Sequence, residues 1–135
     1  MLRQRNVILV DDNQIFLEGL KSLLERRHDL QVIYTYNSGT DLLADDKFGY
    51  ADLILLDIEM PGINGFETAK RINYLYPQIK IIAITMYQDQ VYLQQLIEAG
   101  FKGFVNKTEV DHSLFAVIDS VLKNTFSFPE NIELK

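Results

Sequence analysis

The sequence predicts an α/β protein in which a parallel, five-stranded sheet is covered by helices on both faces. Five short apolar runs have the length of strands and are apolar throughout, which is typical of strands buried on both faces. The segments between them carry apolar residues at helical spacing, so strands and helices alternate along the chain. The 135 residues are enough for one domain with a substantial core.

The five predicted strands are 7–10, 30–34, 53–56, 79–84 and 103–105. A helix is expected after each strand, on apolar positions that are, in chain order, Phe16, Leu20, Leu23 and Leu24; Leu42 and Leu43; Phe66, Ala69, Ile72 and Tyr76; Leu93, Leu96 and Ile97; and Leu114, Ile118, Val121 and Leu122. Asp12 or Asn13 is placed to cap the first helix. Pro77 follows the third helix and Gly100 closes the fourth. The last helix has more apolar residues than one narrow stripe, so it is expected either to be deeply buried or to meet a partner.

Composition excludes several classes of function. The 13 basic and 19 acidic side chains give a formal charge of -6, which argues against direct nucleic-acid binding through phosphate neutralisation. The chain has no cysteine, so a disulfide framework and a thiolate metal site are both excluded. No apolar run approaches the ~20 residues of a membrane helix, and the N-terminus lacks the apolar region of a signal peptide. We therefore expect a soluble, cytoplasmic protein.

Side chains suited to phosphoryl chemistry follow four of the predicted strands. They are Asp11 and Asp12 after the first, Asp57 after the third, Thr85 after the fourth and Lys107 after the fifth. The carboxyl ends of parallel strands meet at one edge of the sheet, where functional groups of such folds collect. Three carboxylates at one edge repel one another unless a cation joins them, and oxygen ligands favour Mg²⁺ or Mn²⁺ over zinc. The expected donors are Asp12, Asp57 and the carbonyl oxygen of Glu59, with Asp11 holding a metal-bound water.

An aspartate flanked by a metal, a lysine and a hydroxyl group can attack a phosphoryl group and become an aspartyl phosphate. Lys107 would supply a positive charge for a phosphoryl oxygen, and Thr85 a hydrogen-bond donor. Taken singly, each residue has an ordinary explanation. The acid pair could cap a helix, Asp57 could begin a turn, and the lysine could be solvated. Only the combination predicts a phosphoryl site.

Four segments carry a resemblance to a known family. They are Asp11-Asp12, the run LLDIEMPGING at 55–65, Ile84-Thr85 and the run GFVNK at 103–107. In order and spacing they resemble the receiver domain of two-component response regulators, and the resemblance extends from about residue 6 to residue 122. It implies a flavodoxin-like, doubly wound sheet with strand order 2-1-3-4-5.

The resemblance also implies a role for each matching residue. Asp57 would accept a phosphoryl group from a histidine kinase or a phosphotransfer protein, and Asp11 and Asp12 would be the acid pair that holds Mg²⁺. Thr85 would be the switch hydroxyl, Lys107 the phosphate-binding lysine and Phe104 the switch aromatic. Phosphorylation would draw the hydroxyl of Thr85 toward the phosphate and make room for Phe104 to rotate inward. Plain core packing explains an aromatic residue at position 104 equally well.

Residues 12–20 and 121–130 look most like the NarL/FixJ branch, whose members usually continue into a linker and a LuxR-type DNA-binding domain. The expected organisation is a receiver domain at 1–123, followed at 124–135 by a tail or the start of a linker. Control of transcription would then pass through a helix-turn-helix domain outside these 135 residues, and the first and last helices are candidates for a homodimer contact.

Three alternatives remain open at this stage. They are a stand-alone receiver that acts by protein contact, a pseudo-receiver, and an aspartate-nucleophile phosphatase of the haloacid dehalogenase class. The sequence departs from many receivers in having Thr108 rather than proline after the lysine, which leaves the geometry of that peptide bond open. In receivers, the positions of Glu59 and Tyr87 flank the path of the hydrolytic water, so the resemblance implies an effect of both on the lifetime of the phosphoryl group, of either sign.

Overall fold

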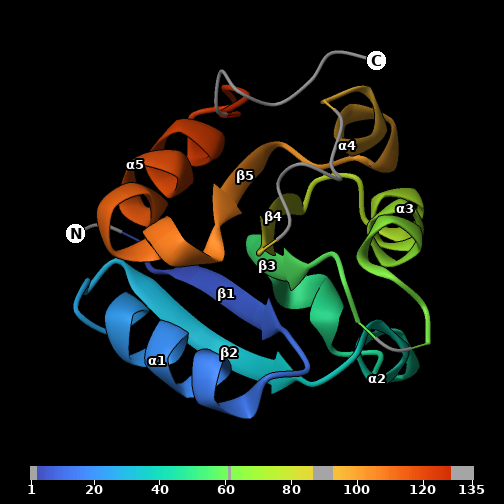
Figure 1. Ribbon diagram of the computed structural model, residues 1–135, viewed down its shortest axis with the longest axis horizontal. Helices are drawn as coiled ribbons and strands as arrows, with labels where there is room; N and C mark the ends of the chain where they lie inside the picture. The colour runs from blue at the N-terminus through green and yellow to red at the C-terminus, as the bar shows by residue number, and fades with distance from the viewer. Residues whose placement is uncertain (1–2, 61, 87–92, 129–135) are drawn as a thin grey trace.

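The computed structural model describes residues 3–60, 62–86 and 93–128 and contains a parallel sheet in the order β2-β1-β3-β4-β5 (Figure 1). The strands are β1 (Arg5–Val10), β2 (Leu30–Tyr36), β3 (Leu53–Asp57), β4 (Lys80–Thr85) and β5 (Gly103–Asn106). The α-helices are α1 (Gln14–Leu24), α2 (Gly39–Ala44), α3 (Gly65–Leu75), α4 (Leu93–Ala99) and α5 (Val110–Leu122). Two short 3-10 helices, η1 (Phe48–Tyr50) and η3 (Lys107–Glu109), precede β3 and α5. The predicted fold class and strand order are confirmed.

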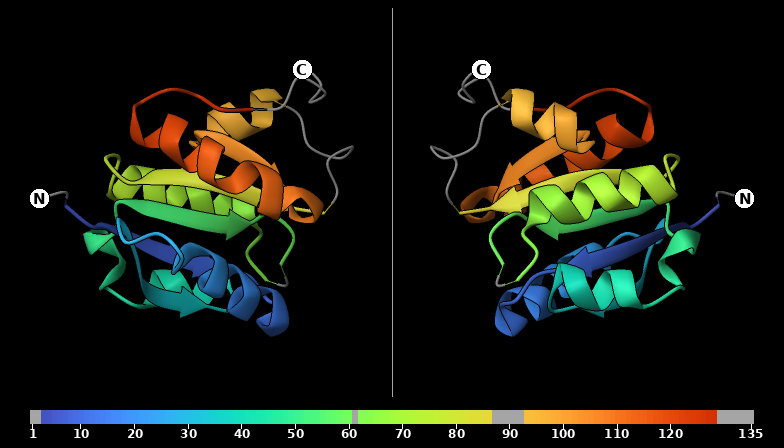
Figure 2. Two further views of the ribbon diagram at one scale, coloured as in Figure 1. Left: turned by 90° about the vertical axis from the view of Figure 1, so that its left-hand side faces the viewer. Right: turned by 90° about the vertical axis from the view of Figure 1, so that its right-hand side faces the viewer.

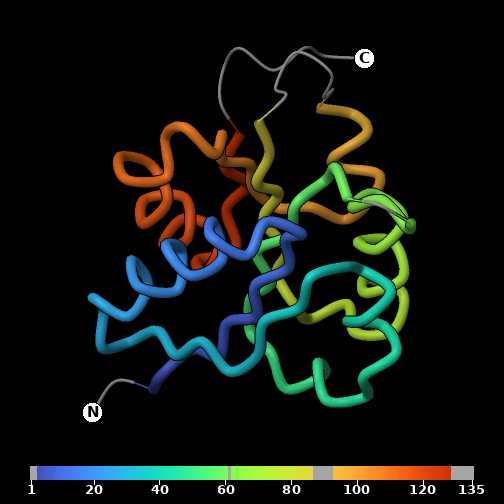
Figure 3. The backbone as a smooth tube through the Cα atoms, turned by 60° about the horizontal axis from the view of Figure 1, so that its bottom comes forward, coloured from blue at the N-terminus to red at the C-terminus, as the bar shows by residue number. Residues whose placement is uncertain are grey.

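The sheet separates two layers of helices. Helices α1 and α5 cover one face, and α2, α3 and α4 cover the other (Figures 1 and 3). Alternate residues of each central strand enter opposite cores: in β3, Leu53 and Leu55 pack under α1 and α5, whereas Ile54 and Leu56 pack under the other three helices. All four side chains are almost completely buried. This double burial explains why the central strands are apolar at every position.

The ends of two helices form as their sequences predict. Asn13 caps α1, because its side-chain oxygen accepts a hydrogen bond from the backbone N–H of Phe16 at 3.1 Å. Gly100 follows α4 with a φ of 98°, a left-handed conformation that glycine adopts at little cost. Ile97, one of the apolar positions that predict α4, lies in this helix with 48% of its surface exposed.

The surplus of apolar residues on α5 is partly explained by burial. Leu114, Ile118 and Val121 are completely buried against the sheet. Four further apolar side chains pack only partly against the same core, and they are Val110, Phe115, Val117 and Leu122. The apolar surface of α5 therefore extends beyond the stripe that faces the sheet.

A short segment after α5 returns to the sheet and lies beside the edge strand β5 (Figure 2). Helix α5 ends at Leu122, and Asn124, two residues later, has a φ of 65°. Ser127 then forms a parallel bridge with Gly103: its N–H donates to the carbonyl of Lys102 at 2.9 Å, and its carbonyl accepts from the N–H of Phe104 at 3.0 Å. This segment satisfies backbone groups that an edge strand would otherwise expose.

Within the described residues, none of the helices combines the length and the apolar composition needed to cross a lipid bilayer.

Gly65 sets how closely α3 approaches the end of β3. A Cβ atom at this position would lie 2.5 Å from both the carbonyl oxygen of Asp57 and the Cα of Ile58, so the backbone itself would have to move. We expect Gly65→Ala to lower the free energy of unfolding by about 1–3 kcal/mol, as overpacking of a tight contact does. Urea denaturation measures this change.

Gly19 offers a matched control, because it lies inside α1 and a Cβ there would meet no atom within 4 Å. Gly19→Ala should raise the free energy of unfolding by about 0.5–1 kcal/mol through helix propensity. Equal effects of the two substitutions would contradict the close contact described for Gly65.

Candidate functional site

The register of the sheet brings the chemically distinctive residues together. Val10 pairs with Leu56, so the next residue on each strand places Asp11 beside Asp57. Asp57 in turn pairs with Ile84, the residue before Thr85. Thr85 pairs with Asn106, which immediately precedes Lys107. Four neighbouring strands therefore deliver their terminal side chains to one edge, as the sequence predicts.

Three carboxylates form a cluster at this edge. Asp11, Asp12 and Asp57 each place a carboxylate oxygen within 4.8 Å of the others. Asp11 and Asp57 are buried, at 2% and 4% exposure, whereas Asp12 is open to solvent. The cluster is able to bind a metal ion, because hard oxygen ligands at this spacing suit a divalent cation.

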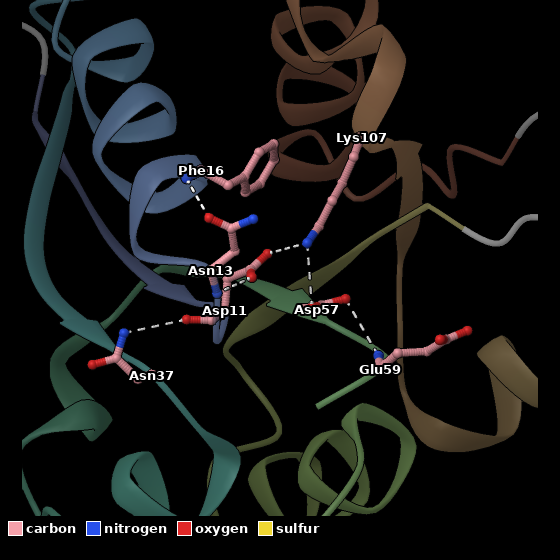
Figure 4. A network of polar contacts seen from close by, with 7 residues as sticks. All are labelled: Asp11, Asn13, Phe16, Asn37, Asp57, Glu59 and Lys107. Atoms are coloured by element: carbon pink, nitrogen blue, oxygen red, sulfur yellow. Dashed lines mark hydrogen bonds and ion pairs between the residues drawn. The ribbon is translucent and has the colours of Figure 1, made fainter. Parts of the chain in front are cut away.

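Lys107 is the positive charge that faces the two buried acids (Figure 4). Its Nζ lies 2.6 Å from Oδ2 of Asp11 and 3.4 Å from Oδ2 of Asp57, and its side chain is only 12% exposed. The backbone also contributes, since the N–H of Glu59 donates to Oδ1 of Asp57 at 3.2 Å and the N–H of Asn13 donates to Oδ1 of Asp11 at 2.8 Å. A single ammonium group is thus shared between two carboxylates.

Burial and repulsion dominate the electrostatics of Asp57. Burial and, next, the negative charge of Asp11 raise the pKa of the Asp57 carboxyl to about 7, although Lys107 and the N–H of Glu59 oppose the shift. Burial alone would lower the pKa of Lys107, but its contacts with Asp11 and Asp57 outweigh that effect and raise the pKa. Lys107 therefore stays charged. In the absence of a metal, the protonated and the charged forms of the Asp57 carboxyl are both populated near neutral pH.

An open pocket of about 440 Å³ gives access to these groups. It is lined by Asp12, Asn13, Asp57, Glu59, Thr85, Met86 and Lys107. Glu59 is exposed at the rim, and Thr85 is buried at the end of β4. Tyr87, which sequence analysis placed beside the path of a hydrolytic water, lies outside the described residues.

Phe104 lies on β5, where it pairs with Ala83 of β4. Its side chain is 2% exposed and belongs to the core between the sheet and α2, α3 and α4. The ring therefore lies inside the core in this structure.

The backbone at Lys107 is held by a local turn, although Thr108 stands where many receivers have proline. The Lys107–Thr108 peptide bond is trans. Asn106 accepts hydrogen bonds on Oδ1 from both the N–H and the hydroxyl of Thr108, at 2.9 and 2.7 Å, and so starts the turn η3. This local cap fixes the backbone from which the lysine extends.

Three residues near the cluster were not assigned a site role from sequence. Asn13 links α1 to Asp11, and Asn37 donates to the carbonyl of Asp11 at 3.5 Å and to Gln14 at 3.0 Å. Phe16 places its ring centroid 4.6 Å from Nζ of Lys107. The acid pair followed by polar residues hinted at Asn13 as a cap, but no sequence signal distinguished Phe16 from an ordinary core aromatic.

Comparison with known proteins decides the family. The model of the response regulator receiver domain matches residues 7–119. The chain therefore belongs to the response regulator receiver family. A receiver domain is in general a signalling domain. Transcriptional regulatory protein LnrK of Bacillus subtilis is 34% identical over 116 residues, which are 86% of this chain and 51% of that protein.

Solved structures agree with this family assignment. A LuxR-family response regulator from Aurantimonas superposes with a TM-score of 0.87 at 26% identity, over 96% of this chain and 92% of that chain. The isolated receiver of RcsB from Salmonella enterica, determined with phosphomimetic BeF3-, gives 0.84 at 26% identity over 95% of both chains. The similarity to LuxR-type regulators that the sequence predicts is thereby confirmed. The receiver spans about half the length of the curated relatives it matches.

The raised pKa of Asp57 predicts how stability depends on pH. Between its ordinary value of 3.8 and about 7, Asp57 keeps a proton in the folded state that the unfolded chain has lost. Its contribution to stability therefore falls as pH rises through this window. We expect Asp57→Asn to be more stable than the wild type at pH 8, on the order of 2–4 kcal/mol, and nearly equal at pH 4.

Urea denaturation in a chelator at the two pH values measures this difference. Asp46→Asn removes an exposed acid outside the cluster and should show no comparable gain at pH 8. Adding Mg²⁺ should stabilise the wild type more than Asp57→Asn, since a ligand stabilises the state that binds it. Equal stability of wild type and Asp57→Asn at pH 8 would contradict repulsion within the cluster.

Proposed function

We propose that the chain is a phosphorylation-dependent receiver in which Asp57 accepts a phosphoryl group from a histidine kinase or a phosphotransfer protein. The observation that carries the proposal is the shared ammonium group of Lys107, which lies within 3.4 Å of both Asp11 and Asp57. A buried carboxylate next to a fixed cation and a strand-end hydroxyl is suited to accepting one phosphoryl group. The family assignment favours this role over that of an aspartate-nucleophile phosphatase.

Mg²⁺, or Mn²⁺ in its place, fits the acidic cluster. Two buried acids share one ammonium group, and their repulsion raises the pKa of Asp57, so a further cation at this edge would relieve uncompensated negative charge. The residues that would hold it are Asp11, Asp12 and Asp57, together with the carbonyl of Glu59, the donor that the receiver family suggests. When bound, the metal would neutralise charge on the carboxylates and on the phosphoryl oxygens.

The transfer step itself needs little covalent machinery from the protein. A carboxylate oxygen of Asp57 attacks the phosphorus atom, the bond from phosphorus to the donor nitrogen breaks, and the leaving imidazole takes up a proton. Lys107 moves from its contact with Asp57 to a phosphoryl oxygen, and Thr85 donates its hydroxyl hydrogen to another. Positioning and charge stabilisation account for the rate, as in phosphoryl transfer generally. Slow hydrolysis of the aspartyl phosphate would reset the receiver.

The proposed output passes through Thr85, Phe104 and the edge strand β5. The backbone N–H of Phe104 donates to the carbonyl of Ser127, so Phe104 is hydrogen-bonded to the segment that follows α5. A shift of Thr85 toward the phosphate would alter the space available to the buried ring of Phe104 and, with it, this edge. We propose a receiver at 1–123 and a tail or linker start at 124–135, of which the first residues, through Ser127, still cover the edge of β5. A DNA-binding domain would be controlled through this tail in the cytoplasm.

Homodimerisation through α1 and α5 is a further part of the proposal. The two helices lie on the same face of the sheet (Figures 1 and 3), and α5 carries apolar side chains that are only partly buried. Ile15 on α1 is 83% exposed. We expect phosphomimetic BeF3- to raise the dimer fraction measured by sedimentation, and Phe115→Glu to abolish that rise because it introduces a charge into the apolar face. A rise induced by BeF3- that persists in Phe115→Glu would place the interface elsewhere.

Intact mass spectrometry after incubation with acetyl phosphate and Mg²⁺ tests the proposed function. We expect one added phosphoryl group in the wild type, none in Asp57→Asn, and none in a chelator. Lys107→Ala should slow incorporation by about 10- to 100-fold, because a hydrogen bond to a charged group is worth about 1.5–3 kcal/mol.

Asp46→Asn serves as the control, since this exposed acid lies outside the cluster and should leave incorporation unchanged. A phosphoryl adduct that persists in Asp57→Asn would contradict the assigned acceptor. Absence of any adduct in the wild type would favour a pseudo-receiver, and steady hydrolysis of a phosphomonoester would favour a phosphatase.

A further inference from the structure

We propose that Phe16 is a positioning residue for phosphoryl transfer, whose aromatic face holds the ammonium group of Lys107 at the acidic cluster. The inference rests on the proposed function, in which Lys107 contacts the incoming phosphoryl group. Nζ of Lys107 lies 4.6 Å from the ring centroid of Phe16, within the range of an attractive cation–π contact. The same nitrogen reaches Asp11 and Asp57, so the ring and the two carboxylates together surround it.

A closed circuit of contacts fixes the ring relative to the lysine (Figure 4). Oδ1 of Asp11 accepts the N–H of Asn13 at 2.8 Å, and Oδ1 of Asn13 accepts the N–H of Phe16 at 3.1 Å. The ring of Phe16 faces Lys107, whose Nζ returns to Oδ2 of Asp11 at 2.6 Å. The helix cap that starts α1 therefore also sets the distance between the ring and the ammonium group.

The position of Phe16 on α1 supports this role. The side chain is partly buried and packs against the core under α1 and α5, and the same ring lies against Nζ of Lys107. A flexible lysine side chain loses conformational entropy when it is held in one place. Because the ring of Phe16 already restricts Lys107 before transfer, less entropy is lost when the ammonium group binds the phosphoryl group. Phe16 would thus act through Lys107 without touching the phosphoryl group.

Substitutions at position 16 separate the aromatic face from simple apolar volume. Phe16→Leu keeps an apolar side chain but removes the ring, whereas Phe16→Tyr keeps the ring. We expect Phe16→Leu to slow phosphoryl incorporation from acetyl phosphate by about 2- to 30-fold, the range that a cation–π contact spans from exposed to desolvated sites. Phe16→Tyr should retain most of the wild-type rate. Glu18→Gln, at an exposed position two residues further along the same helix, is the matched control.

A double-substitution comparison distinguishes positioning from a structural effect. In a Lys107→Ala background, Phe16→Leu should cause no further loss of rate, because the group on which the ring acts is gone. An equal loss in both backgrounds would overturn the proposal, as would a Phe16→Tyr rate no better than that of Phe16→Leu. Urea denaturation of each variant shows whether a loss of rate follows from unfolding.

A spectroscopic measurement tests the contact without relying on phosphorylation. Protons of the Lys107 ε-methylene group lie near the aromatic ring, so their NMR signals should be shifted upfield in the wild type and in Phe16→Tyr. The shift should disappear in Phe16→Leu, and its persistence there would overturn the proposal. A wild type that shows the ring-induced shift but takes up no phosphate would contradict the proposed function while leaving the contact of Phe16 with Lys107 intact.

Discussion

Two buried carboxylates that share one ammonium group determine the character of this receiver. Asp11 and Asp57 lie side by side at the ends of the central strands, and Lys107 compensates only part of their charge. Repulsion within such a pair is costly in a buried setting, so a further cation at this edge would be stabilising. A bound cation would therefore reduce the electrostatic repulsion between Asp11 and Asp57.

The remainder of the fold is arranged to keep this unfavourable pair in place. Strands β1 and β3 are buried on both faces, and the two helical layers prevent them from sliding or separating. Backbone amides from the loops after these strands, at Asn13 and Glu59, hold one oxygen of each carboxylate. Since the acids sit at strand ends rather than on long loops, their spacing is set by sheet register and changes little when the surface does.

Sequence patterns predicted the sheet and the meeting of the strand-end acids, hydroxyl and lysine at one edge, because both follow from the order and spacing of short apolar runs. Strands buried on both faces are apolar throughout, and parallel strands gather their terminal residues at one edge. The contact between Phe16 and Lys107 could not be predicted, since an aromatic residue in the first turn of a helix looks like any core residue. The bridge from Ser127 to Gly103 was equally hidden, because residues 124–128 carry no strand pattern and pair through backbone atoms alone. The exposure of Ile97 depends on how α4 packs, which helical spacing does not determine.

The bridge at Ser127 has a practical consequence for where the domain is cut. A chain ended at Lys123, directly after α5, would remove the partners of the Lys102 carbonyl and the Phe104 N–H. The edge of β5 would then present open backbone groups beside an apolar core, a surface that invites strand-to-strand association between molecules. Self-association of such a shortened domain would reflect the missing cover rather than a signalling dimer. Domain boundaries drawn past Phe128 avoid this artefact.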